Sequence, residues 1–96
     1  MIINYIRDSC LTINYIEIHN DQGAVHNEYG PARIYHINSR IDNEIWIING
    51  VWHNEKGPAY VEYASKGVVS YKSYWLYDKK LTKQQWEDQL VTKLYW

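Results

Sequence analysis

Short stretches of alternating apolar and polar residues recur along the chain. The clearest lie at 32–37, 59–63 and 69–77, where successive side chains would point to opposite faces of a sheet. Two further segments, 3–6 and 13–16, share the order Ile-Asn-Tyr-Ile and predict an N-terminal hairpin. The pattern therefore predicts a mainly β protein.

Turn residues separate these segments. Asn49-Gly50 stands between two apolar runs, and this dipeptide favours a type I′ hairpin turn because both central residues need a positive φ. The Gly-Pro pairs at 30–31 and 57–58 each end one extended segment and begin the next, since proline fixes φ and lacks an N–H. The predicted sheet is therefore built from short antiparallel strands.

A block of seven residues is duplicated. His-Asn-Glu-Tyr-Gly-Pro-Ala at 26–32 returns as His-Asn-Glu-Lys-Gly-Pro-Ala at 53–59, 27 residues later, which indicates a repeated hairpin unit. We expect each block to shape a turn, with its asparagine accepting a local backbone hydrogen bond and its histidine packing beside a tryptophan. The residues assigned to turns are His26, Gly30, Pro31, Asn49, Gly50, His53, Gly57 and Pro58.

A third, partial unit closes the array. Residues 75–80 match 46–51 at an offset of 29, with Lys79 in place of the turn glycine. A capping-box pattern, Thr-x-x-Gln at 82–85, then begins a helix expected from about 83 to 94. One domain is expected, with an N-terminal hairpin at 1–18, β-hairpin repeats at 19–80 and a C-terminal helix at 81–96.

The order Trp-x-x-Asn-Gly-x-x-His-x-x-x-Gly-Pro-Ala at 46–59 resembles the MORN-like repeat proteins, especially the variety frequent in phages and giant DNA viruses. The Trp-Leu-Tyr segment and polar helix at 75–93 are also similar to those proteins. The resemblance covers residues 19–93, but Asn27 and Asn54 stand where its pattern usually has arginine. It implies a curved antiparallel sheet of MORN-like hairpin repeats with one C-terminal α-helix, and a viral accessory role without established catalytic residues.

Charge and composition narrow the possible partners. The formal net charge is −1 and the pI about 6.4, which does not favour binding to nucleic acid or an anionic membrane. Residues 1–65 hold four Lys or Arg against eight Asp or Glu (−4), whereas 66–96 hold six against three (+3). No apolar run reaches the ~18 residues of a membrane span, and no signal-peptide pattern opens the chain. Because Cys10 is the single cysteine, no internal disulfide can form, and we expect a cytoplasmic protein.

The duplicated histidines are the first candidates for chemistry. His26 and His53 each precede a glutamate by two positions, but equivalent residues of successive hairpins should lie about 10 Å apart at ~4.8 Å per strand. Two nitrogens on one zinc ion are at most ~4 Å apart. Catalysis by Cys10 would need a base such as His19 or His36 beside it. We therefore expect no metal site, no cofactor and no enzyme activity.

Aromatic residues carry the more specific expectation. The chain has ten Tyr and five Trp but no Phe, so every ring carries a hydrogen-bonding atom and suits a surface with one wet side. Tyr, Trp and Arg dominate binding surfaces, and strand alternation should leave one set of rings as core and the other free. The candidate binding residues are Arg33, Tyr35, Trp46, Tyr60, Tyr63, Tyr71 and Trp75.

Three functions fit these observations. The leading hypothesis is a small viral accessory protein that binds and inhibits a host protein, such as a defence component. The alternative is a sponge for a small signalling nucleotide, with a ring stacked on the base and Arg33 or Arg40 on phosphate. The third is a structural module that self-associates into a homo-oligomer.

Overall fold

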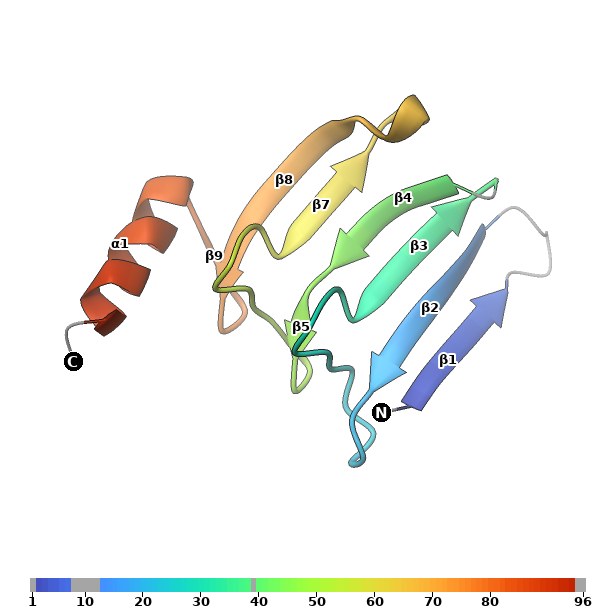
Figure 1. The fold of residues 1–96 in the computed structure, drawn as a ribbon, viewed down its shortest axis with the longest axis horizontal. Helices are drawn as coiled ribbons and strands as arrows, with labels where there is room; N and C mark the ends of the chain where they lie inside the picture. Colours follow the sequence, from blue (N-terminus) through green and yellow to red (C-terminus); the bar gives the residue numbers. More distant parts are fainter. Residues whose placement is uncertain (1, 8–12, 39, 95–96) are drawn as a thin grey trace.

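The computed structural model describes residues 2–7, 13–38 and 40–94. Within them the chain is mainly β-structure with one C-terminal helix, as the sequence pattern predicts (Figure 1). Cys10 and the turn expected beside it lie outside the described residues.

One antiparallel sheet forms the body of the molecule. Six strands follow in the spatial order β1-β2-β3-β4-β7-β8, and the short β9 pairs with the outer side of β8. A separate two-stranded hairpin consists of β5 (Ile47–Ile48) and β6 (Val51–Trp52). The strands of the main sheet are β1 (Ile2–Arg7), β2 (Ile13–His19), β3 (Arg33–Ile37), β4 (Arg40–Ile45), β7 (Tyr60–Tyr63), β8 (Val69–Leu76) and β9 (Lys79–Leu81).

Strand β4 is not indicated by the hydrophobic pattern. Its sequence, Arg-Ile-Asp-Asn-Glu-Ile, includes Asp, Asn and Glu, which are depleted in strands. Consecutive residues of β3 pair with Asn43 and Ile41, so Asp42 is left as an extra, bulged residue. The bulge breaks the two-residue alternation on which the sequence argument depends.

The turns that join β5 to β6 and β8 to β9 have positive φ angles at both central residues. Asn49 (φ 48°) and Gly50 (φ 83°) form the predicted turn between β5 and β6. The prediction for the third unit is wrong by one residue, because its turn consists of Tyr77 (φ 51°) and Asp78 (φ 67°). Lys79 opens β9 instead of replacing the turn glycine, and β8 ends one residue earlier than predicted. Aspartate tolerates this left-handed conformation better than most residues.

The two copies of the duplicated block close their turns in the same way. Asn27 Oδ1 accepts a hydrogen bond from the backbone N–H of Tyr29 (3.1 Å), and Asn27 Nδ2 donates to the carbonyl of Pro31 (3.1 Å). Asn54 makes both bonds at the equivalent positions, at 2.9 Å each. The predicted turn role of this asparagine is thus confirmed, and each side chain makes a second bond that was not predicted.

The histidine of each block connects to the following hairpin turn. His26 Nδ1 accepts a hydrogen bond from the backbone N–H of Asn49 (2.9 Å). In the second block, His53 Nδ1 accepts from the backbone N–H of Tyr77 (3.1 Å). The ring of His53 packs against Tyr77, with 4.3 Å between centroids, and lines one cavity together with Trp46. The one-residue shift of the third turn places this tyrosine there.

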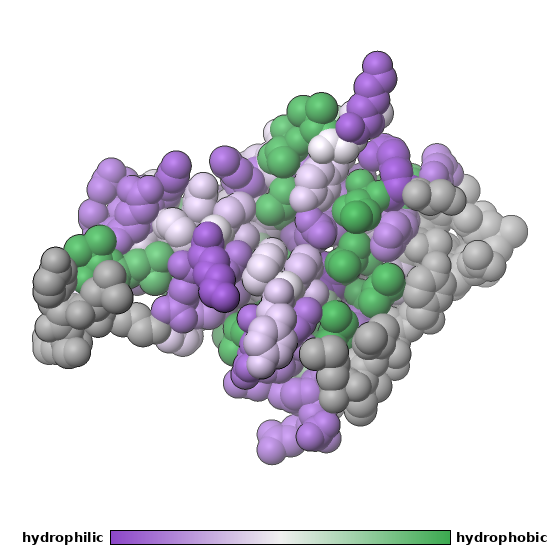
Figure 2. Space-filling view, in the orientation of Figure 1, coloured by the Kyte–Doolittle hydropathy of each residue, from purple (hydrophilic) through white to green (hydrophobic). Residues whose placement is uncertain are grey.

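The buried core is small. Ala32, Ile45 and Ile47 form its centre and are at most 5% exposed. The partly buried residues around it are Val25, Tyr35, Trp52 and Tyr60. The molecule measures 49 × 34 × 18 Å, which leaves a thin layer with many side chains near water. Figure 2 shows hydrophobic residues gathered over the middle of the sheet on the face turned to the viewer.

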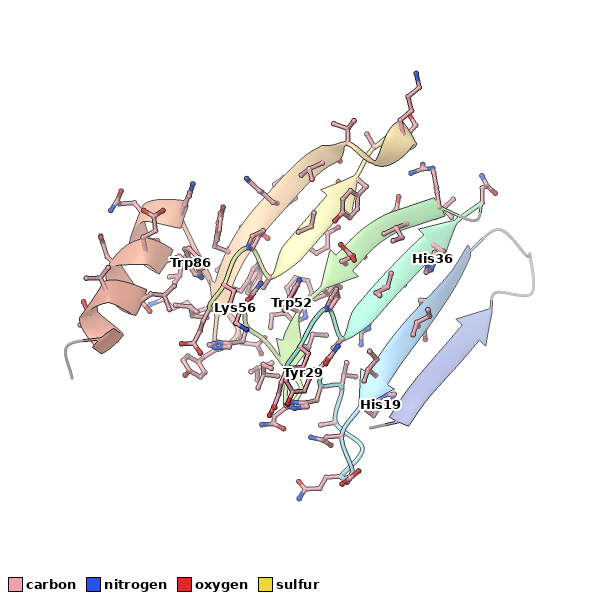
Figure 3. The ribbon with its side chains drawn as sticks, in the orientation of Figure 1. His19, Tyr29, His36, Trp52, Lys56 and Trp86 are labelled. Carbon is pink, nitrogen blue, oxygen red and sulfur yellow. The ribbon has the colours of Figure 1, made fainter. Side chains whose placement is uncertain are left out.

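Helix α1 (Lys83–Leu94) lies at the end of the sheet beyond β9 (Figure 1). Thr82 and Gln85 form the predicted capping box, in which each side chain accepts from the backbone N–H of the other, at 3.1 and 3.0 Å. Trp86 lies between α1 and the sheet (Figure 3), and its indole N–H donates to the carbonyl of Asn54 (2.8 Å). Among the described residues, no helix has the length and apolar character to cross a membrane.

Candidate functional site

One side of the sheet gathers most of the candidate binding residues. Residues that pair across antiparallel strands share a face, and so do residues two positions apart along one strand. Tyr35 pairs with Tyr15, with 4.9 Å between ring centroids. The cross-strand pairs of β3, β4, β7 and β8 place further residues of these strands on the same face. We call it the aromatic face, and its members are Tyr15, Arg33, Tyr35, Tyr60, Tyr71 and Trp75.

Trp52 of the β5–β6 hairpin joins the rings of the aromatic face. Its ring stacks parallel to Tyr60 (5.7 Å between centroids, interplanar angle 1°) and meets Trp75 edge-on at 4.8 Å. Tyr71 continues the row, 6.0 Å from Tyr60. These rings are half-buried, except that Tyr71 is 45% exposed. The row therefore has a packed side and a side open to solvent.

Two of the predicted binding residues lie outside the aromatic face. Tyr63 belongs to the opposite side of β7, where its hydroxyl donates to Glu44 (2.5 Å). Trp46 lines a cavity of about 320 Å³ together with His53 and Tyr77, next to the duplicated blocks. The predicted set of seven therefore divides into five residues on one face and two elsewhere.

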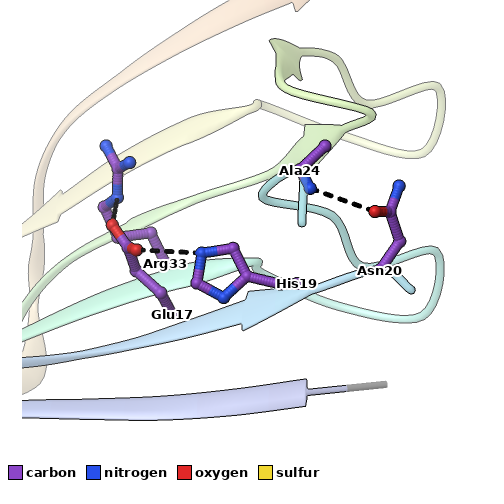
Figure 4. Close-up of polar contacts among 5 residues, drawn as sticks. All are labelled: Glu17, His19, Asn20, Ala24 and Arg33. Atoms are coloured by element: carbon purple, nitrogen blue, oxygen red, sulfur yellow. Dashed lines mark hydrogen bonds and ion pairs between the residues drawn. The ribbon is translucent and has the colours of Figure 1, made fainter. Parts of the chain in front are cut away.

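The arginine at the rim of the aromatic face is already paired. Arg33 Nε donates to one oxygen of Glu17 (2.8 Å), and His19 Nε2 lies 3.2 Å from the other oxygen (Figure 4). Nearby, Asn20 Oδ1 accepts from the backbone N–H of Ala24 (3.0 Å) and closes the turn after β2. A charge-assisted bond to a carboxylate compensates the charge of the guanidinium and fixes its orientation. An incoming anion would have to compete with Glu17 for this arginine.

Carboxylates keep two tyrosine hydroxyls protonated. Burial, together with the hydrogen bond to Glu62 (3.0 Å), raises the pKa of the Tyr60 hydroxyl to about 12. The hydrogen bond to Glu44, together with burial, raises the pKa of the Tyr63 hydroxyl to about 12. The tyrosinate anion would face a carboxylate in both places, so the neutral form is favoured.

We expect these two hydroxyls to make the protein less stable between about pH 10 and pH 12. Their folded-state pKa lies above the ~10 of a free tyrosine, so their stabilisation is complete below about pH 10. It is lost as the pH rises through the folded-state pKa. Tyr60→Phe and Tyr63→Phe should each flatten the alkaline limb of a plot of unfolding free energy against pH, measured by chemical denaturation.

Tyr71→Phe is the matched control for this measurement. The hydrogen bond from Lys80 Nζ (2.9 Å) lowers the pKa of the Tyr71 hydroxyl, which is the opposite direction. Its removal should leave the alkaline loss of stability in place. An alkaline limb that stays equally steep in both test variants would contradict the assignment.

Trp52 completes the aromatic face, yet the sequence argument does not select it. The repeat offset of 27 residues was the available signal, because it makes Trp52 equivalent to Val25. Both side chains pack against the buried core. The backbone N–H of Trp52 also donates to Asp78 (2.8 Å), a contact across two hairpins that no local pattern indicates. Glu17 was missed because a charged residue on a strand is usually solvent-exposed.

Comparisons with family models, curated proteins and solved structures find no match for this chain. Within the described ranges, no group of three or more His, Cys, Asp or Glu residues is placed to hold a metal ion. The fold and the aromatic face define a thin antiparallel β-sheet protein with two groups of contacting rings on one face, Tyr15 with Tyr35 and Trp52 with Tyr60, Tyr71 and Trp75.

Proposed function

We propose that this protein acts without catalysis, by binding another protein through the aromatic face. The observation that supports this most is the group of half-buried rings on the face that also carries the paired arginine, where Trp52 contacts both Tyr60 and Trp75. Such rings are fixed before binding, so they bury a large area at a small cost in side-chain entropy. A protein partner can cover that whole area when it binds.

Charge supports a protein partner more than a nucleotide. The formal net charge is −1, and Arg33 on this face is held by Glu17 at 2.8 Å. A depletion of free charge with enrichment of Tyr and Trp is typical of the centre of protein interfaces. The aromatic face therefore suits apolar and hydrogen-bonded contacts.

The biological setting follows from the resemblance of 46–59 to MORN-like repeats of phages and giant DNA viruses. It supports an accessory protein that inhibits a host protein, with a defence component as the partner. The single cysteine supports action in the cytoplasm of the host cell.

Tyr35→Ser tests the aromatic face directly. The immobilised protein is incubated with lysate of the natural host, and bound proteins are identified by mass spectrometry. We expect one protein to be captured in stoichiometric amount, and Tyr35→Ser to reduce its capture by about tenfold or more, the effect of removing an interface hot spot. Circular dichroism of the variant shows whether it remains folded.

Tyr29→Ser is the matched control, because Tyr29 is 82% exposed and lies outside the aromatic face. It should leave capture unchanged. Equal losses in the two variants would contradict the assignment of the face. Small molecules released from the purified protein are analysed in parallel. Stoichiometric, tight uptake of a cyclic nucleotide would contradict a protein partner and support nucleotide binding instead.

A further inference from the structure

Strand β8 has a free outer edge. Strand β9 pairs with residues 74–76 of β8, so the outer side of 69–73 has no strand partner among the described residues. Val69 and Tyr71 are 49% and 45% exposed, and Ser70 and Lys72 are exposed as well, whereas Ser73 is buried. At ~3.3 Å per residue the edge is roughly 16 Å long, which is the length of a short strand. Its main-chain donors and acceptors are open to another chain.

A groove of about 450 Å³ runs beside this edge. It lies between β8, β9 and the start of α1, and hydrophilic residues cover that start in Figure 2. Three of its lining residues, Lys72, Lys80 and Lys83, are cationic, and its described lining includes no carboxylate. The lysines account for half of the six basic residues in 66–96. The groove is therefore a positively charged part of a protein with a net charge of −1.

The lysines flank the edge on both faces of the sheet. Lys80 pairs with Trp75 and so shares the aromatic face, whereas Lys72 pairs with Val61 on the opposite side. A hydrogen bond to the Tyr71 hydroxyl (2.9 Å) holds Lys80 Nζ along the groove, 5.7 Å from the centroid of that ring. Successive residues of a strand point to opposite faces, so neighbouring side chains of an added strand would each reach a lysine.

We propose that the outer edge of β8 binds an extended acidic segment of a partner protein, which adds to the sheet as a further strand. Main-chain hydrogen bonds to 69–73 supply the pairing, as in other cases of strand addition. Adjacent carboxylates on the segment pair with Lys72 and Lys80. Lys83 at the start of α1 adds a third positive charge that attracts the segment. This site goes beyond the aromatic face and does not depend on it.

A second copy of the chain fits this edge less well. The other outer strand of the sheet, β1 (Ile2–Arg7), has the sequence Ile-Ile-Asn-Tyr-Ile-Arg, which carries a positive charge and no carboxylate. It offers no carboxylate to the lysines. An acidic segment matches the groove in both charge and backbone chemistry.

A peptide titration followed by amide NMR of the full chain tests the proposal. The probe is a capped peptide of about seven residues, Thr-Glu-Glu-Val-Glu-Glu-Thr, which matches the length of the edge. We expect shift changes concentrated at 69–73 and 80–85. Two altered peptides accompany it: one has glutamine in place of each glutamate, and the other carries N-methyl groups on alternate backbone amides. Each should bind about tenfold more weakly or worse, because charge or main-chain pairing is lost.

Charge-reversed variants locate the site on the protein. Lys72→Glu and Lys80→Glu should each weaken peptide binding by about tenfold, since an attraction becomes a repulsion at close range. Lys56→Glu makes the same charge change at an exposed residue outside the groove and should leave affinity unchanged. Tyr35→Ser should also leave it unchanged, so failure of the aromatic face and failure of this edge are distinguishable.

Several results would overturn the proposal. If the glutamine peptide binds as tightly as the acidic peptide, the partner need not be acidic. If the N-methylated peptide binds as tightly, the segment does not add as a strand. No binding of the acidic peptide refutes the site. If light scattering shows concentration-dependent dimers and the shift changes at 69–73 follow dimer formation, the edge is occupied by a second copy instead. Tighter binding of a short single-stranded RNA at the same residues would assign the groove to nucleic acid.

Discussion

Trp52→Ala should lower the free energy of unfolding by about 3 kcal/mol, the lower end of the range for removal of a core aromatic ring, because this ring is half-buried. The indole is stacked on Tyr60 and meets Trp75 edge-on, with centroid distances of 5.7 and 4.8 Å. It also packs against the small centre of the core. Few other apolar contacts can compensate, because the fully buried part of the core consists of small and aliphatic side chains.

Denaturant unfolding followed by circular dichroism measures this loss. Val25→Ala is the matched variant from the preceding repeat unit, and we expect it to cost about 1 to 2 kcal/mol, because fewer methyl groups leave the core. Tyr29→Ala should have an effect near zero, because Tyr29 is 82% exposed. A Trp52→Ala loss no larger than that of Tyr29→Ala would show that the ring contacts do not stabilise the fold.

Asn54→Asp should cost about 2 kcal/mol or more, although it changes a single side-chain group. Asn54 is 6% exposed, and its Nδ2 donates to the carbonyl of Pro58 (2.9 Å). An aspartate oxygen at that position would face the carbonyl oxygen with no proton between them, and a buried acceptor would lose its partner. The bond from the backbone N–H of Lys56 can still form, because a carboxylate accepts it as well as an amide does.

Two matched variants separate this effect from a general effect of added charge. Asn27→Asp repeats the change in the first block, where the geometry is the same and the donor distance to Pro31 is 3.1 Å, so a similar loss is expected. Asn38→Asp makes the change at an exposed residue with φ 51° and should be nearly neutral. Thermal unfolding of the three variants is sufficient, and equal melting temperatures for Asn54→Asp and Asn38→Asp would refute the argument.

The local elements could be predicted because their chemistry is contained in a few adjacent residues. Asn49-Gly50 forms its turn because asparagine and glycine tolerate positive φ, and Thr82 with Gln85 caps α1 through two short hydrogen bonds. The duplicated block was recognised as a turn because asparagine bonds to nearby backbone groups. None of these features needs knowledge of a distant strand.

The composition of the candidate site could be predicted only in part, because it depends on register. Asp42 is an extra residue in β4, and the sequence does not show where a bulge falls. Tyr63 lies three residues after Tyr60 in β7, so the alternation already places the two rings on opposite faces, but only the pairing with β4 and β8 shows which face holds the other rings. Trp52 reaches the aromatic face from a separate hairpin. Long-range pairing decides all three positions.

The same logic explains the error in the third unit. Aligning Trp46 with Trp75 places the turn one residue too late, because β8 reaches its turn one residue sooner after its tryptophan than the chain does in the second unit. Backbone geometry instead selects Tyr77 and Asp78, whose N–H groups donate to His53 and to the carbonyl of Trp52. The contact between neighbouring units, rather than identity of side chains, sets the position of the turn.

The bond from each block histidine to the next turn has a consequence for how such a chain can grow. Its donor is a main-chain amide, supplied by Asn49 in one case and by Tyr77 in the other, two residues with unrelated side chains. This one bond therefore needs only a correctly shaped bend in the neighbouring unit, whereas the bond from the Trp52 N–H to the Asp78 carboxylate also needs a particular side chain at the turn. A unit gained or lost by gene duplication or deletion would keep the histidine bond whatever the side chain that follows it.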